Sequence, residues 1–417
     1  MHHFHYRGDD LYCEDVPVAR IASELGTPAY IYSHATLTRH FQVFDQAFAG
    51  VPHLICFAMN ANANLAVLKL FSDLGGGLDV VSAGELFRGL KAGVPPQRIV
   101  YAGVGKSRDE IAYALKADIL MFNVESGQEL RLIHEVASGM GAKARVALRV
   151  NPDVDPKTHP YISTGLKKSK FGIDIGQALE EYDVARGLRS LEVVGIHQHI
   201  GSQITDVRPF VDALEKTAAL VRTLRERGTE IRYLDVGGGL GITYKDEEPP
   251  LPSDFARALI EVIRDLDVTV VLEPGRVLVG NAGILLTRVL YTKRTAAKNF
   301  LIVDAGMNDL ARPSLYGSYH AIQPVRQTPG RPEAIVDVVG PICESGDFLA
   351  KDRGLPHCQP GELLAVMSAG AYGHSMSSNY NARPRAPEVM VRGDRHQVVR
   401  ERESFDDLVR GERTLDE

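Results

Sequence analysis

Several features are absent from this 417-residue sequence, and each absence excludes a class of protein. No apolar run reaches the length of a membrane span, and the first residues lack the charged start and apolar stretch of a secretory signal. There is no block of lysine or arginine and the formal net charge is −6, so we expect no binding to nucleic acid or to a membrane. The 39 glycines and 22 prolines follow no period, which excludes a collagen-like or low-complexity chain.

Cysteine is also scarce. Cys13, Cys56, Cys343 and Cys358 form no CxxC pair and no disulfide framework, so the sequence predicts a reducing, cytoplasmic location. The histidines at positions 2, 3 and 5 have no cysteine or carboxylate at ligand spacing. We therefore interpret them as a polar N-terminal arm and expect no metal site.

The middle of the chain alternates short β-branched or apolar runs with segments of helical spacing. Such alternation predicts parallel strands, and eight repeats predict a closed (β/α)₈ barrel. An open doubly wound sheet is the alternative, but it would need fewer strands and a nucleotide-binding motif after the first. The eight runs cover residues 54–58, 78–81, 99–102, 119–122, 145–150, 193–197, 232–236 and 269–272.

The pattern changes after about residue 281 to strand-like runs separated by proline and glycine. These runs predict an antiparallel β domain over residues 281–417, beside a barrel over residues 31–280. We expect residues 1–30 to join the β domain. The Pro-, Lys- and Gly-rich stretch 151–176 is interpreted as a functional loop. The predicted strands of the β domain cover residues 284–291, 300–303, 334–339, 363–367, 389–391 and 398–400.

Chemically unusual residues follow the predicted barrel strands, at the end where barrel enzymes carry their chemistry. A glycine triplet, Gly237 to Gly239, can point backbone N–H groups at an anion, although a triplet alone is often only a turn. Glu273 can pair with a protonated ring nitrogen, or with Arg276 in a salt bridge. His199 can stack on a planar cofactor, or be a satisfied barrel histidine.

These motifs, with others in the β domain, resemble those of the diaminopimelate decarboxylases. That group belongs to the pyridoxal-phosphate family that shares its barrel with alanine racemase and eukaryotic ornithine decarboxylase. The resemblance runs from about residue 26 to residue 404 and keeps the motifs in order in both predicted domains. The motifs are HQHIGSQ (197–203), GGGLG (237–241), EPGR (273–276), DAGMND (304–309), RP (312–313), GPICESGD (340–347) and GAYG (370–373).

The resemblance implies pyridoxal 5′-phosphate as the cofactor. His199 would stack on the pyridine ring, and Glu273 would bond the ring nitrogen and keep it protonated. The phosphate would be held mainly by the glycine triplet. The further cofactor-binding residues implied in this way are Asp79, Ser202, Gly237, Gly238, Gly239, Gly275, Arg276 and Tyr372.

The resemblance also implies a substrate site. Arg276, Arg312 and Tyr316, with Tyr372 nearby, would bind a distal carboxylate, and arginine supplies the fork geometry for this. Glu344 would accept a distal ammonium, and Cys343 would protonate the carbanion after CO₂ leaves. In the family, the last two residues reach the neighbouring subunit's site, so a homodimer is implied.

One departure from the family pattern concerns catalysis. The segment FAMNAN (57–62) has Asn60 where the family has its Schiff-base lysine. An amide nitrogen is not nucleophilic and cannot take that role. Asp79, which would face this lysine, is retained, and Lys69 lies well along the following segment. We therefore expect strongly impaired activity from a chain that otherwise has the complete site.

The sequence indicates a pyridoxal-phosphate-dependent decarboxylase that converts meso-2,6-diaminopimelate to L-lysine, the last step of lysine biosynthesis. Decarboxylation of another basic amino acid or of carboxynorspermidine is an alternative. Arg312 together with Glu344 argues for a far end that carries both a carboxylate and an ammonium. A catalytically dead pyridoxal-phosphate-binding homologue is the remaining alternative, and Asn60 is the reason to keep it.

Overall fold

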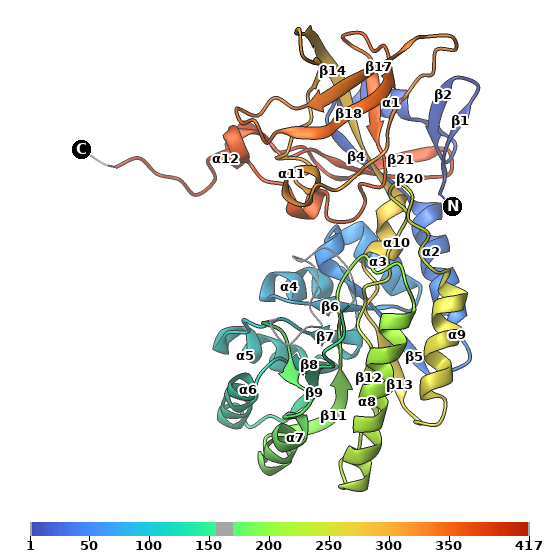
Figure 1. The fold of residues 1–417 in the computed structure, drawn as a ribbon. Helices are drawn as coiled ribbons and strands as arrows, with labels where there is room; N and C mark the ends of the chain where they lie inside the picture. The colour runs from blue at the N-terminus through green and yellow to red at the C-terminus, as the bar shows by residue number, and fades with distance from the viewer. Residues whose placement is uncertain (1, 156–169, 416–417) are drawn as a thin grey trace. The chain divides into compact units, whose positions relative to one another are not determined.

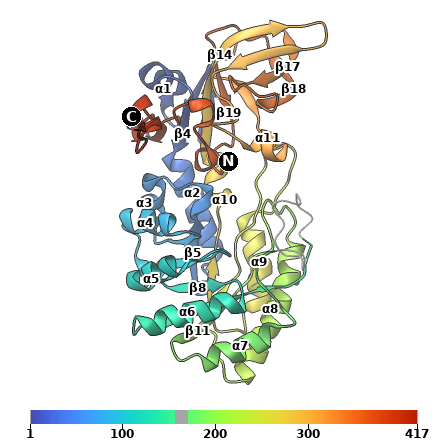
Figure 2. The ribbon, with the colours of Figure 1, turned by 90° about the vertical axis from the view of Figure 1, so that its left-hand side faces the viewer.

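The computed structural model describes residues 2–155 and 170–415 (Figures 1 and 2). The chain divides into two compact units, and each is described by itself. Unit 2 comprises His40–Thr243 and Glu247–Val277. Unit 1 comprises Met1–Arg39, Tyr244–Asp246 and Leu278–Glu417.

Unit 2 is a closed barrel of eight parallel strands, as the sequence predicts. The strands pair in chain order, and the last, β13, pairs with the first, β5, to close the ring. A two-residue strand, β10 (Ile173–Asp174), adds to the side of β9. The barrel strands are β5 (His53–Ala58), β6 (Gly77–Val80), β7 (Ile99–Tyr101), β8 (Met121–Val124), β9 (Ala144–Asn151), β11 (Leu191–His197), β12 (Tyr233–Asp235) and β13 (Thr269–Leu272).

Helices follow the strands along the chain, and side-chain caps fix where several of them begin. Asn64, Ser82 and Ser126 each accept a hydrogen bond from a backbone N–H of the first turn, and Ser107 forms a capping box with Glu110. Each cap immediately precedes its helix, so the loops after the strands end at defined residues. The helices are α2 (His34–Ala47), α3 (Leu65–Asp73), α4 (Ala83–Lys91), α5 (Arg108–Ala117), α6 (Gly127–Gly139), α7 (Ala178–Gly187), α8 (Arg208–Glu226), α9 (Pro252–Ile263) and α10 (Arg276–Val279).

Apolar side chains from six of the barrel strands form a core cluster inside unit 2. Successive side chains of a strand alternate between its two faces, so residues two positions apart share a face. A residue two positions after a member of this cluster, on the same strand, therefore points to the same side of the strand as that member. The cluster consists of Cys56, Val100, Leu120, Met121, Ala147, Val194 and Val271.

Unit 1 is built on a nine-stranded sheet together with a three-stranded sheet. Most of its strand pairs are antiparallel, as the sequence predicts, but β15 with β17 and β20 with β4 are parallel, so the larger sheet is mixed. These parallel pairs join strands that are distant in sequence, and the alternation of apolar and polar residues within one strand does not indicate such pairing. The strands are β1 (Phe4–Arg7), β2 (Asp10–Cys13), β3 (Val16–Pro17), β4 (Ala29–Ser33), β14 (Gly283–Arg294), β15 (Asn299–Val303), β16 (Ile322–Pro324), β17 (Glu333–Val339), β18 (Phe348–Pro356), β19 (Leu363–Val366), β20 (Glu388–Arg392) and β21 (Arg395–Arg400).

The N-terminal strand β4 lies between β14 and β20 in the larger sheet of unit 1. Its five residues are all buried. Among the strands that the sequence patterns did not indicate, β18 carries a charged stretch and pairs with β17 through two irregularities in register, so its alternation is broken. The helices of unit 1 are α1 (Val18–Leu25), α11 (Arg312–Tyr316) and α12 (Phe405–Leu408).

In the described part of the chain, no helix has both the length and the hydropathy that crossing a membrane requires. The expected functional loop 151–176 falls mostly outside the described residues, because only 151–155 and 170–176 of it are described.

Candidate active site

Polar side chains replace apolar ones at the C-terminal ends of the barrel strands. Asn123 follows Met121 on β8 and Arg149 follows Ala147 on β9, each two positions along the same face. Glu273 follows Val271 in the same way at the end of β13. The ends of the strands therefore hold a polar layer, as barrel enzymes require.

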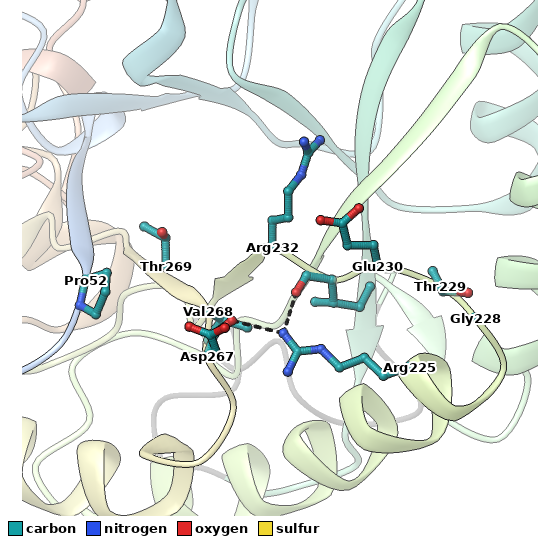
Figure 3. A pocket seen from close by; sticks show the side chains of 10 residues that line it. Pro52, Arg225, Gly228, Thr229, Glu230, Arg232, Asp267, Val268 and Thr269 are labelled. Atoms are coloured by element: carbon teal, nitrogen blue, oxygen red, sulfur yellow. Dashed lines mark hydrogen bonds between the residues drawn. The ribbon is translucent and has the colours of Figure 1, made fainter.

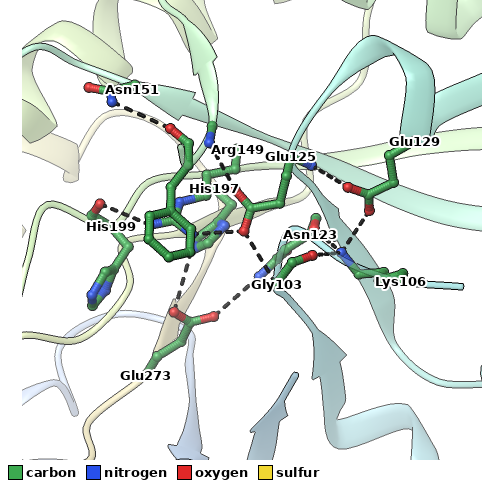
Figure 4. Close-up of polar contacts among 12 residues, drawn as sticks. Gly103, Lys106, Asn123, Glu125, Glu129, Arg149, Asn151, His197, His199 and Glu273 are labelled. Atoms are coloured by element: carbon green, nitrogen blue, oxygen red, sulfur yellow. Dashed lines mark hydrogen bonds and ion pairs between the residues drawn. The ribbon is translucent and has the colours of Figure 1, made fainter. Parts of the chain in front are cut away.

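Asn123 holds two carboxyl groups of this layer together, and Figure 4 shows its contact with one of them, Glu273. Its Nδ2 lies 2.9 Å from Oδ2 of Asp235 and 3.2 Å from Oε1 of Glu273, and its side chain is fully buried. Burial raises the pKa of Asp235 well above its usual value and raises that of Glu273 to about 7. These two carboxyl groups therefore hold protons at a pH where ordinary carboxyl groups are ionised.

His197 lies beside Glu273 but remains neutral. Its Nε2 is 3.3 Å from Oε2 of Glu273, yet the geometry is not that of a hydrogen bond. Burial lowers the pKa of His197 to about 4 despite the raising effect of Asp235. Full burial disfavours the imidazolium form of His197, so the pair is not a salt bridge at neutral pH despite the short distance.

Two buried ion pairs, Arg149 with Glu125 and Lys106 with Glu129, also lie at this end of the barrel. Nη1 of Arg149 is 2.8 Å from Oε1 of Glu125, and Arg149 lowers the pKa of that carboxyl against the opposing effect of burial. Nζ of Lys106 is 2.7 Å from Oε1 of Glu129 and 2.8 Å from the carbonyl oxygens of both Gly103 and Asn123. Three acceptors match the three donors of an ammonium, so Lys106 has a structural role and is no substitute for a nucleophilic lysine.

The glycine triplet is tied to the neighbouring loop. A Cβ on Gly238 would lie 2.0 Å from the carbonyl oxygen of Glu273, so only glycine fits there. The N–H of Gly237 donates to Oδ1 of Asp235, and the N–H of Gly238 donates to Nδ1 of His199 at 3.1 Å. The backbone of the triplet therefore also positions Asp235 and His199.

The contact with Gly238 sets the tautomer of His199. Because Nδ1 accepts a hydrogen bond, the proton of the neutral ring is on Nε2. Burial and the nearby charge of Arg149 lower the pKa of His199 well below its usual value, although part of the ring remains exposed. A neutral, oriented imidazole is suited to stacking on a planar ring.

Asp79 and Asn60 lie near the ends of neighbouring strands. Asp79 on β6 pairs with Ala58 on β5, and Asn60 follows in a short helical turn, Met59–Ala61. Oδ1 of Asp79 is buried and has no hydrogen-bond partner among the described residues, while Asn60 is exposed. Burial and the charge of Glu273 raise the pKa of Asp79 well above its usual value.

Arg276 connects two of the sequence motifs. It begins α10, three residues after Glu273, and its Nη2 donates to Oγ of Ser202 at 3.2 Å. Gly275 directly precedes it and is buried. The contact joins the EPGR loop to the HQHIGSQ loop, two of the motifs singled out in the sequence.

The remaining predicted site residues belong to unit 1. Arg312 begins α11 and is buried, whereas Tyr316 at its end and Tyr372 are partly exposed. Cys343 and Glu344 lie between β17 and β18, and both are exposed in the single chain. The hydroxyl of Tyr380 donates to Glu344 at 3.0 Å, and the N–H of Cys343 donates to the side chain of Asn381.

Sequence reasoning missed Asn123 and Asp235 as members of the site. The signal for both is a single polar residue in an otherwise apolar strand, MFNV for β8 and YLD for β12. A polar side chain inside an apolar strand is buried and must form hydrogen bonds there, so such a residue is a candidate for a functional role.

The polar layer fits the cofactor implied by the sequence. It offers a buried carboxyl for a ring nitrogen, an oriented imidazole for a ring face, and glycine backbone at the end of a strand, where barrels bind phosphate. His197, Asp235 and Glu273 also bring three ligand atoms within 4.8 Å, so they could hold a metal ion. Asn123 and Gly237 already donate hydrogen bonds to the two carboxyl groups, so we interpret Asp235 and Glu273 as hydrogen-bonded. Neither ring nitrogen of His197 has a hydrogen-bond partner among the described residues.

A pocket of about 560 Å³ lies at the opposite end of the strands (Figure 3). Arg225 crosses it and donates to the carbonyl oxygens of Ile231, Leu266 and Asp267. Its lining includes residues just before β5, β12 and β13, at the N-terminal ends of the strands, which in barrels contribute to stability and not to the chemistry. We therefore place the chemistry at the other end, where polar groups are buried and their pKa values are shifted.

Comparison with known proteins identifies the family. Residues 34–280 match the pyridoxal-dependent decarboxylase, pyridoxal binding domain family. The chain is 53% identical to the diaminopimelate decarboxylase of Pseudomonas aeruginosa over 100% of both chains. It is 52% identical to that of Aquifex aeolicus, over 97% of this chain and 96% of the relative.

A solved structure supports the same assignment. The diaminopimelate decarboxylase of Helicobacter pylori, complexed with L-lysine, has a TM-score of 0.91 and 46% identity, and the match covers 94% of this chain and 98% of that one. The chain therefore belongs to the diaminopimelate decarboxylases within the pyridoxal-dependent decarboxylase family.

Proposed function

We propose that the polar layer of the barrel binds pyridoxal 5′-phosphate and that the chain acts on meso-2,6-diaminopimelate. Membership of the family makes the reaction a pyridoxal-dependent decarboxylation that yields L-lysine. The observation that carries the assignment of the site is the buried Glu273, held by Asn123 among groups with strongly shifted pKa values. When bound, the cofactor supplies an electron sink for the electron pair that CO₂ leaves behind.

The barrel residues bind and orient the cofactor. Glu273 accepts a hydrogen bond from the ring nitrogen and favours its charged form, while His199 packs against the ring face. In the barrel, the phosphate is held by backbone N–H groups around Gly239, by the hydroxyl group of Ser202 and by the loop at Gly275. The raised pKa of Glu273 supports this role, because the buried carboxyl gains most from a cationic partner.

The residues of unit 1 proposed for the substrate are those that the resemblance assigns to its far end. Arg312 and Tyr316 bind the carboxylate at the far end of the substrate, and Glu344 binds the ammonium beside it. Cys343 donates the proton that replaces CO₂, a role that an accessible thiol can fill. Cys343 and Glu344 are exposed in one chain, which supports their delivery to the site of a second subunit, so we propose a homodimer.

Asn60 impairs the chain as written. A lysine at this position would hold the cofactor covalently. Once released from that bond, its amine would provide a general acid or base near Asp79, whose buried Oδ1 has no hydrogen-bond partner among the described residues. Without it, the cofactor is held by non-covalent contacts alone. General acid–base catalysis by such a group contributes roughly 10²–10⁴-fold, so we expect a rate lower by at least about this factor.

Two further properties belong to the proposal. All four cysteines are free thiols, which supports a cytoplasmic location.

Residues 31–280 and 281–417 form the barrel and the β domain, and residues 1–30 join the latter. The division of the chain near Arg39 and Val277 supports these boundaries to within about ten residues.

A substrate panel tests the proposal. The chain and an Asn60→Lys variant are each loaded with pyridoxal phosphate, and CO₂ release is measured from meso-diaminopimelate, ornithine, arginine and carboxynorspermidine. We expect rapid release by the variant from diaminopimelate alone and slow release by the parent chain. Preference of the variant for another substrate would overturn the assignment of the substrate.

Asn60 also favours a second candidate, a pyridoxal-phosphate-binding homologue with no catalytic role. In that case the parent chain would bind pyridoxal phosphate, and Asn60→Lys would gain covalent attachment without decarboxylation of any substrate in the panel. Activity of the variant with diaminopimelate would exclude this candidate.

A further inference from the structure

Arg312 of unit 1 is held in place by three side chains. Its Nη1 lies 3.0 Å from Nε2 of His320, and its Nη2 donates to Oγ of Ser318 at 3.3 Å. Its guanidinium carbon lies 4.7 Å from the centre of the Tyr244 ring. All three contacts are made by uncharged side chains, and they fix the direction of the guanidinium.

The protonation of His320 follows from the hydrogen bonds at its two ring nitrogens. Its Nδ1 lies 2.9 Å from the carbonyl oxygen of Met367, which can only accept, so Nδ1 carries the proton. Its Nε2 faces the N–H of Arg312, which can only donate, so Nε2 must be the acceptor. His320 is therefore a neutral imidazole with one defined tautomer, and its ring is 0% exposed.

The backbone around His320 is fixed by a sheet. The N–H of Met367 donates to the carbonyl oxygen of Ala321 at 2.8 Å, directly beside the bond from His320 to Met367. Met367 follows β19, which pairs with both β14 and β16. The imidazole is thus attached to a rigid sheet at its Nδ1 side, and its Nε2 side is aimed at Arg312.

Tyr244 closes the group from a different part of the chain. Its ring meets the ring of His320 edge to face, with centroids 5.3 Å apart and planes at 74°. It comes from the three-residue segment 244–246, which groups with unit 1 although it follows the GGGLG motif in sequence. Arg312, His320 and Tyr244 therefore pack against one another as a group of three.

We propose that His320 is a positioning residue that sets the guanidinium of Arg312 for the carboxylate at the far end of the substrate. The inference rests on the proposed role of Arg312 in substrate binding. It predicts that His320 acts on ligands with a carboxylate at that end and not on ligands without one. A guanidinium recognises a carboxylate through paired N–H groups of fixed direction, so its orientation governs affinity.

Two ligands separate this role from general stability. L-lysine, the product, keeps the far-end carboxylate and ammonium, whereas 1,5-diaminopentane has the same chain and amines without a carboxylate. Binding of each to the full chain with pyridoxal phosphate is measured by calorimetry. We expect Arg312→Ala to weaken lysine binding about tenfold or more while changing diaminopentane binding by less than about twofold.

A matched pair of variants isolates the contact. His320→Asn places an amide near the position of Nδ1, which keeps the bond to Met367 and removes the acceptor for Arg312. His320→Gln places an oxygen near the position of Nε2, which keeps the acceptor and removes the other bond. We expect the Asn variant to weaken lysine binding about tenfold and the Gln variant to weaken it by clearly less, with diaminopentane unaffected by either.

The outcomes are distinct. If Arg312→Ala leaves lysine binding unchanged, the proposed role of Arg312 fails. If Arg312→Ala weakens lysine binding but His320→Asn does not, only the positioning role fails. Equal loss of both ligands in both His320 variants, with matching falls in melting temperature, would make His320 structural and overturn the inference. Ser318→Ala, which removes the longer contact, offers a milder variant that is expected to fold and to weaken lysine binding slightly.

Discussion

The two ends of the barrel hold their charged side chains in different ways. At the C-terminal ends of the strands, Asp79, Asp235 and Glu273 are buried and their pKa values are raised. At the N-terminal ends, Arg225 donates to backbone carbonyl oxygens and Arg232 pairs with an exposed Glu192 around an open pocket. Both ends are polar, but only one places ionisable groups where water cannot stabilise their charge.

The difference teaches which feature identifies an active site. A pocket can form wherever loops leave space, and in the one in Figure 3 the two arginines, Arg225 and Arg232, already have partners. Buried carboxyl groups close to one another destabilise their own ionised forms, so a fold retains them for a reason other than stability. The C-terminal end has this property and the N-terminal end does not.

The largest expected effect comes from placing a lysine at each end. Asn60→Lys puts an amine at the polar layer, and Glu230→Lys puts one at the exposed rim of the opposite pocket. We expect the first to raise CO₂ release from diaminopimelate by at least roughly 10²–10⁴-fold and the second to leave it unchanged.

Mass spectrometry after borohydride reduction with pyridoxal phosphate provides the second readout. In Asn60→Lys, the cofactor should be bonded to residue 60. In Glu230→Lys, the new lysine should carry no cofactor. A parent chain that already reacts as fast as Asn60→Lys would show that another lysine holds the cofactor.

The next effect concerns stability at the C-terminal end. Lys106→Met leaves the carboxylate of Glu129 buried without its cation, so we expect a loss of about 3–5 kcal/mol in the free energy of unfolding. The matched control is Lys69→Met, whose pair with Asp73 is 60% exposed on both sides and should contribute about 0–1 kcal/mol. Urea unfolding measures both, and equal losses would contradict the distinction between buried and exposed pairs.

Much of this contrast was accessible from the sequence. The eight apolar runs identified every barrel strand, because parallel strands buried on both faces are continuously apolar. The motifs after those runs lie at the C-terminal ends of the strands, and Glu273, His199 and the glycines follow β13, β11 and β12 as expected. This placement follows from one rule, that residues after the C-terminal ends of the parallel strands lie at the same end of the barrel.

Other parts of the site depend on packing that the sequence does not encode locally. Asn123 and Asp235 meet across the barrel from strands more than a hundred residues apart, so their contact follows only from closure of the ring. The orientation of Arg312 depends on His320 and Tyr244, which belong to no recognised motif. The parallel pairing of β4 with β20 joins the two ends of the chain and has no local signal.

A pH series sharpens the contrast further. Burial raises the pKa of Glu273 from 4.5 to about 7, so the folded protein holds this proton more tightly than the unfolded chain does. The resulting stabilisation is complete below pH 4.5 and is lost as the pH rises to about 7. Glu273→Gln stays neutral, so it should gain stability relative to the parent by on the order of 1–3 kcal/mol over this range.

Urea unfolding of the cofactor-free proteins measures this gain. His197→Gln should show the opposite sign, because burial lowers the pKa of His197 from 6.5 to about 4. The stabilisation from a neutral histidine is present above pH 6.5 and is lost as the pH falls to about 4. Parallel pH curves for the parent and both variants would contradict the assigned protonation of the polar layer.

The smallest effect is expected at the N-terminal end. The side chains of Arg232 and Glu192 are 45% and 36% exposed, so water solvates both charges and screens their attraction. Arg232→Ala should therefore lower the free energy of unfolding by about 0–1 kcal/mol and leave lysine binding unchanged. Salt tests the same interpretation, because the difference between variant and parent should shrink at high ionic strength. A loss of lysine affinity in Arg232→Ala would show that the opposite end of the barrel takes part in binding, and the contrast between the two ends would no longer hold.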